Sequence, residues 1–193
     1  MEPTFHCLIA TIGRPSLQVM LDSLLPQLSE MDCLTVVFDG FSEIPSIFDF
    51  TSAKCPVVLY CEPTALGFYG HGIRNKYAGL LETRDFVMHA DDDDIYTLGT
   101  FDYLREHCLS NDTIYIGKMQ CIDGRIVGVK IELGYIGTPC GIIPFSYNKT
   151  AIWQLHHGGD GRFYEELQSK YPDKIVFLDR LIYIVKLLSG SQI

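Results

Sequence analysis

The sequence predicts an α/β protein whose sheet is mostly parallel and flanked by helices. Short apolar runs alternate with segments of helical spacing through the first half of the chain. These runs are continuously apolar, as in strands that are covered on both faces. A chain of 193 residues, 47% of them hydrophobic, can bury one large core and leaves little room for two.

Each element of the first half follows from a local pattern. The run FHCLIA indicates a buried first strand, and Pro15 suits the first turn of the helix after it. Pro26 is expected to kink or end that helix. A second strand, LTVVF, closes on Asp39 and Gly40. The expected strands are 5–10, 34–38, 57–60 and 86–89, and the expected helices are 17–28, 69–81 and 98–108.

The second half predicts a different, mixed organisation. Two strands, 113–120 and 125–131, are expected to form a hairpin across Ile122, Asp123 and Gly124. Residues 134–146 are rich in Gly and Pro, which indicates a loop or short strands. Short helices are expected at 150–155 and 162–170, and extended segments at 175–178 and 181–185. We expect one domain over residues 1–193, with a division near residue 110 inside it.

The charge of the chain limits the classes of partner. The formal net charge is -9 and the isoelectric point is near 5.0. A nucleic-acid surface needs an excess of Lys and Arg to contact phosphates, so we expect no nucleic-acid partner. An anionic small ligand remains compatible with this charge if a metal ion supplies the positive charge.

The cysteine pattern and the chain ends predict a compartment. Seven cysteines occur without a C-x-x-C pair, which is typical of reduced thiols in a reducing compartment. No secretory signal is readable at the N-terminus. The apolar stretch 175–188 contains Asp179, Arg180 and Lys186, so we expect no transmembrane segment. The sequence predicts a soluble, cytoplasmic protein, with peripheral association with a membrane left open.

The strongest local signal is the run Asp91-Asp92-Asp93-Asp94 directly after the apolar strand FVMHA. An acidic run can also be a solvated surface loop, but this one follows a central strand, where open α/β sheets bind ligands. Asp91 and Asp93 point to the same side of an extended segment, so they could share one hard divalent cation. An EF-hand loop is excluded because Ile95 and Tyr96 stand where a ligand and a glycine are needed.

The first strand-to-helix turn lacks a phosphate-binding glycine motif. Neither G-x-G-x-x-G nor a P-loop occurs, so a bound nucleotide would need a metal and isolated basic residues such as Arg74. Asp39, at the end of the second strand, could accept hydrogen bonds from a base or ribose, although Asp before Gly is also common in plain turns. The Gly-containing stretch that begins at Thr138 is expected to lie near a ligand.

Five segments in order resemble the inverting GT-A glycosyltransferases of family 2. They are IATIGRPSLQVMLDSLL, VVFDG, GFYGHGIRNKYAGL, FVMHADDDDIY and GGDGRFYEEL, and together they span roughly residues 5–185. The resemblance implies a Rossmann-like GT-A fold, with a nucleotide-binding half at about 1–110 and an acceptor and catalytic half at about 111–193. It implies transfer of a sugar, with inversion, from a nucleoside diphosphate sugar to a glycan or other hydroxyl. UDP-sugars are favoured, and GDP- or dTDP-sugars are alternatives.

The resemblance also implies roles for individual residues. Asp93 would be the main ligand of Mn²⁺ or Mg²⁺, with Asp91 beside it. Asp160 would be the general base, but this chain has Gly159-Asp160-Gly161 where the family often has Glu-Asp. Glu165 and Glu166 therefore stay alternatives for that role. The residues expected to bind the nucleotide sugar are Thr11, Arg14, Asp39, Arg74, Asn75, Asp91 and Asp92.

Two other functions are alternatives to the transferase. One is a non-catalytic nucleotide-sugar-binding module or a subunit of a larger transferase. The other is a nucleotidyltransferase, for which the turn from Thr11 to Pro15 is a poor match because it lacks a glycine-rich, basic loop. His71 and His89 are expected to make structural hydrogen bonds, and His156-His157 to be an ordinary loop pair. No aromatic residue is assigned to a sugar.

Overall fold

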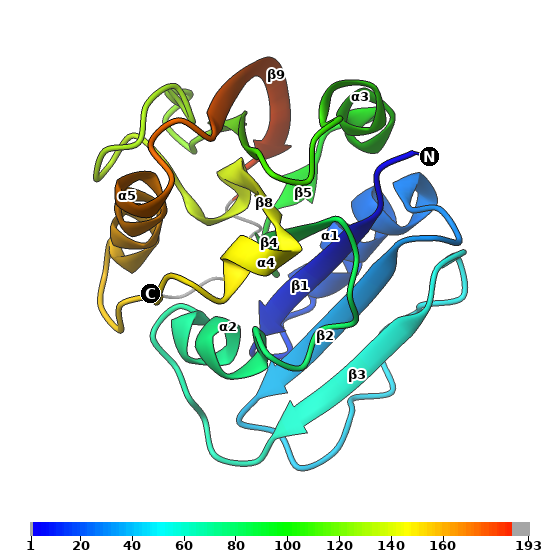
Figure 1. Ribbon diagram of the computed structural model, residues 1–193. Coiled ribbons are helices and arrows are strands. Elements are labelled where there is room, and N and C mark those ends of the chain that lie inside the picture. The colour runs from blue at the N-terminus through cyan, green and yellow to red at the C-terminus, as the bar shows by residue number, and fades with distance from the viewer. Residues whose placement is uncertain (1, 187–193) are drawn as a thin grey trace.

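The computed structural model describes residues 2–186. In this part of the chain nine strands form one sheet (Figure 1). Their order is β3-β2-β1-β4-β8-β6-β9-β5, where β6 is Ile114–Gln120, β8 is Gly141–Pro144 and β9 is Ile175–Ile184, and β7 (Ile126–Val127) pairs with β6. The first-half strands of the sheet are β1 (Phe5–Thr11), β2 (Cys33–Asp39), β3 (Val57–Glu62), β4 (Phe86–Asp91) and the short β5 (Ile95–Tyr96). Strands from both predicted halves thus share one sheet, which is the α/β, mostly parallel class that the sequence predicts.

The first four strands are parallel, and their carboxyl ends meet at one edge. Thr11 pairs with Phe38 of β2, Ala10 pairs with Asp91 of β4, and Asp39 pairs with a residue of β3. β1 and β2 are buried along their whole length, because helices cover both faces. The ends of β1, β2 and β4 therefore bring the predicted polar residues to a common edge of the sheet.

Alternate residues of β1 face two different cores. Phe5 and Ile9 pack in the core that holds α1 (Ser16–Leu24) and α3 (Thr100–His107). Leu8 packs in the second core, against Ile73 of α2 (His71–Tyr77). Figure 1 shows helices on both sides of the sheet. Pro26 does end α1, since a 3-10 turn, Leu25–Gln27, replaces the rest of the expected helix.

The second half adds antiparallel and parallel neighbours to β4. β8 (Gly141–Pro144) pairs with β4 and with β6 (Ile114–Gln120), antiparallel to both. β9 (Ile175–Ile184) runs parallel to β6, and the short β7 (Ile126–Val127) closes the hairpin expected at 122–124. A 3-10 turn (Thr138–Cys140), α4 (Phe145–Asn148) and α5 (Gly159–Lys170) complete the half.

Several predicted boundaries in this half were wrong. The expected helix at 150–155 is absent, and this segment is irregular. Side chains of neighbouring helices bind its backbone: Glu166 accepts from the Ile152 amide, and Asn75 pairs with Trp153. The strand expected at 125–131 stops where Gly128 adopts a φ of +83°. The two segments at 175–178 and 181–185 form one strand with an irregular register.

Three further findings concern the chain as a whole. Among residues 2–186, none of the helices has the length and apolar character needed to cross a bilayer. All seven cysteines carry free thiols. The single-domain prediction includes residue 1 and residues 187–193, which lie outside the described part, and the cytoplasmic location stays a prediction from the sequence.

Candidate active site

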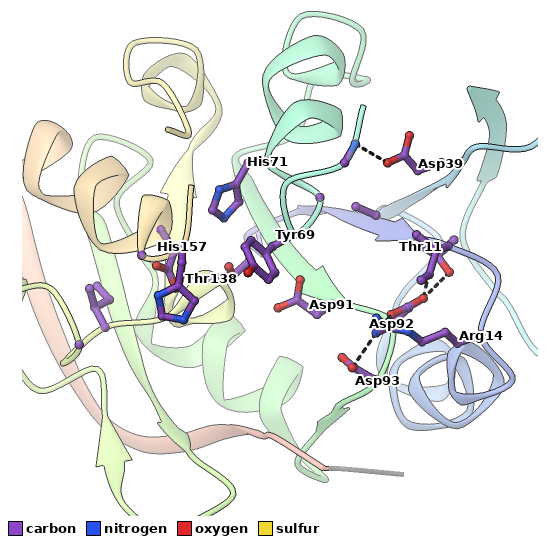
Figure 2. Close-up of a pocket in the computed structure, with 18 of the residues that line it drawn as sticks. Thr11, Arg14, Asp39, Tyr69, His71, Asp91, Asp92, Asp93, Thr138 and His157 are labelled. Atoms are coloured by element: carbon purple, nitrogen blue, oxygen red, sulfur yellow. Dashed lines mark hydrogen bonds and ion pairs between the residues drawn. The ribbon is translucent and has the colours of Figure 1, made fainter. Parts of the chain in front are cut away.

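A pocket of about 750 Å³ opens at the carboxyl edge of β1, β2 and β4. Its lining comes from both halves of the chain. Figure 2 shows Thr11, Arg14, Asp92 and Asp93 on one side, and His71, Tyr69, Thr138 and His157 on the other, with Asp91 between the two groups. The sequence-predicted residues in the lining are Thr11, Arg14, Asp39, Asp91, Asp92, Asp93 and Asp160.

Asp92 joins the ends of β1 and β4 and is almost fully buried. The Thr11 hydroxyl donates to its carboxylate at 2.5 Å, and the Ile12 amide donates at 3.3 Å. Arg14 adds an ion pair at 3.2 Å. Burial raises the pKa of Asp92, while the Thr11 bond and the Arg14 charge oppose the rise. These contacts occupy the carboxylate, so Asp92 and Thr11 act first as the scaffold of this edge.

The carboxylate of Asp93 is more accessible than that of Asp92 and less accessible than that of Asp91. Its side chain is 27% exposed, and Oδ2 pairs with Nη1 of Arg14 at 2.7 Å. Burial and the neighbouring charges of Asp91 and Asp92 raise its pKa. Asp94 turns inward, where burial followed by the charges of Asp91 and Asp93 raises its pKa to about 8. The edge therefore carries crowded, partly desolvated carboxylates, an environment that attracts a cation.

Arg74 lies behind the pocket wall. Its fully buried guanidinium pairs with Oδ1 of Asp91 at 2.6 Å and donates to the carbonyl oxygen of Tyr69 at 2.7 Å. It also lies over the Trp153 ring, 5.2 Å from the centroid. Arg74 is not among the residues that line the pocket in the described part of the chain. It therefore orients Asp91 and the loop of Tyr69 from the side away from the pocket. A direct contact of Arg74 with a nucleotide stays a prediction.

Asn75 is likewise turned away from the pocket. Its side-chain amide donates to the carbonyl of Trp153 at 2.8 Å and accepts from the Trp153 amide at 2.9 Å. Both polar groups of the side chain are thus used to hold the segment that leads into α5. The described lining does not include Asn75, and its predicted contact with a nucleotide sugar is untested.

Asp39 shapes a loop at the rim of the pocket. Its two carboxylate oxygens accept from the amides of Leu66 and Gly67 at 2.7 and 2.8 Å. Directly after them, Phe68 and Tyr69 have φ values of +55° and +57°, a left-handed conformation that costs a non-glycine residue about 1–2 kcal/mol. Such strain persists only where the surroundings impose it and is common at ligand sites. Asp39 is therefore placed to line the pocket and to hold its rim.

The opposite wall carries Asp160 in the first turn of α5. Of the alternatives for the base, Glu165 pairs with Arg162 and Glu166 pairs with Lys170, and neither lies in the described lining. The structure thus brings Asp160, and not these two glutamates, to the pocket that Asp91 and Asp93 line.

Tyr69, His71 and His157 are among the lining residues that were not assigned to the site from the sequence. Tyr69 packs edge-on against the His157 ring, with 5.9 Å between centroids. His71 does make the structural bond that was expected, to Gln154, but it also faces the pocket. The glycines of GFYGHG could have indicated these residues. They bracket Phe68-Tyr69 and follow His71, and such spacing is typical of a backbone bent around a ligand.

The pocket carboxylates supply only part of the ligand shell that a divalent cation needs. Among residues 2–186, no three His, Cys, Asp or Glu side chains are arranged to hold a metal by themselves. Asp91 and Asp93 each use one carboxylate oxygen for an arginine. At nucleotide sites one or two carboxylates hold Mg²⁺, and substrate phosphates and water complete its shell. Asp91 and Asp93 fit a cation that arrives with a diphosphate, and they do not fit one held by protein alone.

No protein-family model and no curated protein sequence matches the chain. Solved structures of S. aureus TarS do match. TarS 1–349 in complex with UDP-GlcNAc aligns with a TM-score of 0.71 and 18% identity over 97% of this chain and 60% of that one. A second structure of S. aureus TarS aligns with a TM-score of 0.69 and 19% identity over 95% of this chain and 37% of that one. The complex of TarS 1–349 with UDP aligns with a TM-score of 0.65 and 18% identity over 94% of this chain and 60% of that one.

The chain therefore spans at most about 60% of the length of the TarS chains it matches. TarS is a family 2 GT-A glycosyltransferase. At 18–19% identity the likeness concerns the fold alone, and it agrees with the mixed, mostly parallel sheet and its helices. The chain has the GT-A fold.

Proposed function

We propose that this chain is a metal-dependent glycosyltransferase that uses a nucleoside diphosphate sugar, with a UDP-sugar as the favoured donor. One observation carries the proposal: a single pocket is lined by Asp91 and Asp93 at the sheet edge and by Asp160 on the facing wall. The GT-A fold and the UDP-GlcNAc complex of the structurally similar TarS support it.

The donor would lie along the sheet edge, with its nucleoside toward Asp39 and its diphosphate toward Asp93. Asp91 and Asp93 would hold Mn²⁺ or Mg²⁺ together with the diphosphate. When bound, the cation supplies Lewis-acid stabilisation of the charge that develops on the departing diphosphate. Arg14, which is paired with Asp93 at 2.7 Å and 40% exposed, would add a second positive charge there.

Asp160 would accept the proton of an acceptor hydroxyl as that oxygen bonds to the anomeric carbon. The bond between this carbon and the diphosphate oxygen breaks in the same step, on the opposite face of the sugar. One displacement of this kind inverts the anomeric configuration and forms no covalent enzyme intermediate. General-base catalysis commonly contributes about 10²–10⁴-fold to the rate.

The test compares Asp160→Asn with the matched control Glu165→Gln, which changes a carboxylate outside the described lining. Calorimetry with UDP-GlcNAc and Mn²⁺ measures binding, and UDP release in the presence of glycan acceptors measures turnover. We expect Asp160→Asn to bind the donor with unchanged affinity and to lose about 10²-fold or more in turnover. Unchanged turnover in Asp160→Asn, or an equal loss of turnover in Glu165→Gln, would contradict the assignment of Asp160 as the general base.

The non-catalytic binding module has a distinct outcome in the same experiment. Donor binding that depends on Mn²⁺ and Asp93, without UDP release in any acceptor mixture or in water, would favour the module. The partial coverage of the TarS chains is the observation that keeps this second function in view.

A further inference from the structure

His71 occupies the pocket wall in one defined protonation form. Its Nδ1 lies 2.7 Å from the carbonyl oxygen of Gln154, and a carbonyl oxygen can only accept, so Nδ1 carries the hydrogen. Burial lowers the pKa of His71, although the hydrogen bond to Gln154 opposes part of the fall, so the ring is neutral at pH 7. In a neutral ring with its hydrogen on Nδ1, Nε2 is a hydrogen-bond acceptor.

The His71 ring is buried and packed by its neighbours. His71 is 2% exposed and packs on Trp153, with 5.5 Å between ring centroids. A Cβ at Gly159 would lie 2.8 Å from Nδ1, so the start of α5 rests directly on the imidazole. One helical turn later, Asn75 binds both backbone groups of Trp153. α2 therefore fixes the ring, and with it the segment that positions Asp160.

The second ring nitrogen of His71, Nε2, is available to a ligand in the pocket. Figure 2 shows the His71 ring projecting from α2 toward the pocket interior. No residue in the described range 2–186 makes a hydrogen bond to Nε2. Asp91 and Asp160 line the same pocket, and both carboxylates are close enough to His71 to act on its pKa. Nε2 and the ionised carboxylates are all acceptors, so this region suits a ligand that offers several hydroxyl hydrogens.

We propose that Nε2 of His71 accepts a hydrogen bond from a hydroxyl group of the transferred sugar. The inference rests on the proposed function, in which the sugar lies between the diphosphate held at Asp91 and the base Asp160. His71 borders both carboxylates, and this is the position that the sugar must occupy. His71 is thus a binding residue that helps to determine which donor sugar is accepted.

The experiment measures the coupling between one side chain and one hydroxyl. Calorimetry with Mn²⁺ gives the Kd of UDP, UDP-GlcNAc and its 3-, 4- and 6-deoxy analogues for the native chain, His71→Phe and His71→Gln. We expect the native chain to bind one deoxy analogue about tenfold more weakly than UDP-GlcNAc, the effect of one lost hydrogen bond. His71→Phe should bind that analogue and UDP-GlcNAc equally, and His71→Gln, which keeps an acceptor oxygen, should restore part of the difference.

A control variant separates this contact from a structural role. Lys170→Met removes the contact of Lys170 with the carbonyl of Thr150 in the same segment without removing Nε2, so it should lower the Tm yet keep the discrimination between hydroxyl and deoxy donors. UDP alone should bind the native chain and His71→Phe with the same Kd.

The outcomes distinguish the two proposals. If the native chain binds neither UDP nor UDP-GlcNAc, the proposed function fails and the role of His71 fails with it. If the native chain binds UDP-GlcNAc but His71→Phe discriminates among the analogues as the native chain does, the role of His71 alone is refuted. A native chain that binds all three analogues as tightly as UDP-GlcNAc also refutes it.

Discussion

Gly159 offers a direct test of how α5 positions Asp160. A Cβ built at Gly159 would lie 2.0 Å from the carbonyl oxygen of Gln154 and 2.8 Å from Nδ1 of His71. The closest favourable carbon-to-oxygen contacts are about 3.3 Å, so Gly159→Ala must displace the start of α5 by about 1 Å. Overpacking of this kind costs about 1–3 kcal/mol, and a misplacement of about 1 Å at a reacting group can lower the rate about 10²-fold.

The matched control is Gly79→Ala, since no atom lies within 4 Å of a Cβ at Gly79. Urea denaturation gives the free energy of unfolding, and UDP release from UDP-GlcNAc gives the rate. We expect Gly159→Ala to lose about 1–3 kcal/mol of stability and about 10²-fold in rate, with the Kd of UDP unchanged. Gly79→Ala should stay within about 0.5 kcal/mol of the native chain. Native rate and stability in Gly159→Ala would refute this account of the wall.

Two further predictions concern buried polar groups. Burial lowers the pKa of His89 to about 3, so its neutral form stabilises the fold above pH 6.5 and that contribution is lost as the pH falls toward 3. Between pH 7 and pH 5.5 the native chain should lose about 1 kcal/mol more unfolding free energy than His89→Gln, and equal losses would contradict the assignment. Asp92→Ala should lower the free energy of unfolding, measured by urea denaturation, by about 2–4 kcal/mol, because it removes the acceptor of Thr11 and Arg14. Asp93→Ala should lower it by less than about 1 kcal/mol and should abolish the effect of Mn²⁺ on donor binding. Equal stability losses in the two variants would contradict the different roles given to them.

The parallel half of the fold was predictable because its signals are local. Apolar runs long enough for a strand alternate with segments whose apolar residues have helical spacing. These runs indicated β1, β2, β3 and β4 in the order in which they occur along the chain. The position of the acidic run after a central strand indicated the pocket edge. The alternation expected of an extended segment at Asp91 to Asp93 was wrong: β4 ends at Asp91, Asp92 and Asp93 lie in a turn, and all three residues line the pocket.

The rest depended on contacts between distant residues. Nothing local in the sequence shows that Arg74 reaches behind Asp91 or that Asn75 binds the backbone of Trp153, 78 positions away. The same contact binds the backbone of the irregular segment 150–155, where local spacing had indicated a helix. Likewise, the role of His71 depends on the close approach of Gly159, which is set by how α5 packs against α2.

The central claim is that a divalent cation at Asp91 and Asp93 brings a nucleoside diphosphate into this pocket. A crystal structure with Mn²⁺ and UDP-GlcNAc, with the manganese located by its anomalous scattering, measures this most directly. We predict a manganese peak bridging the Asp93 carboxylate and the diphosphate, with the uridine beside Asp39 and the sugar facing Asp160. A nucleotide bound outside the pocket, or a manganese ion with no contact to either aspartate, would contradict the account.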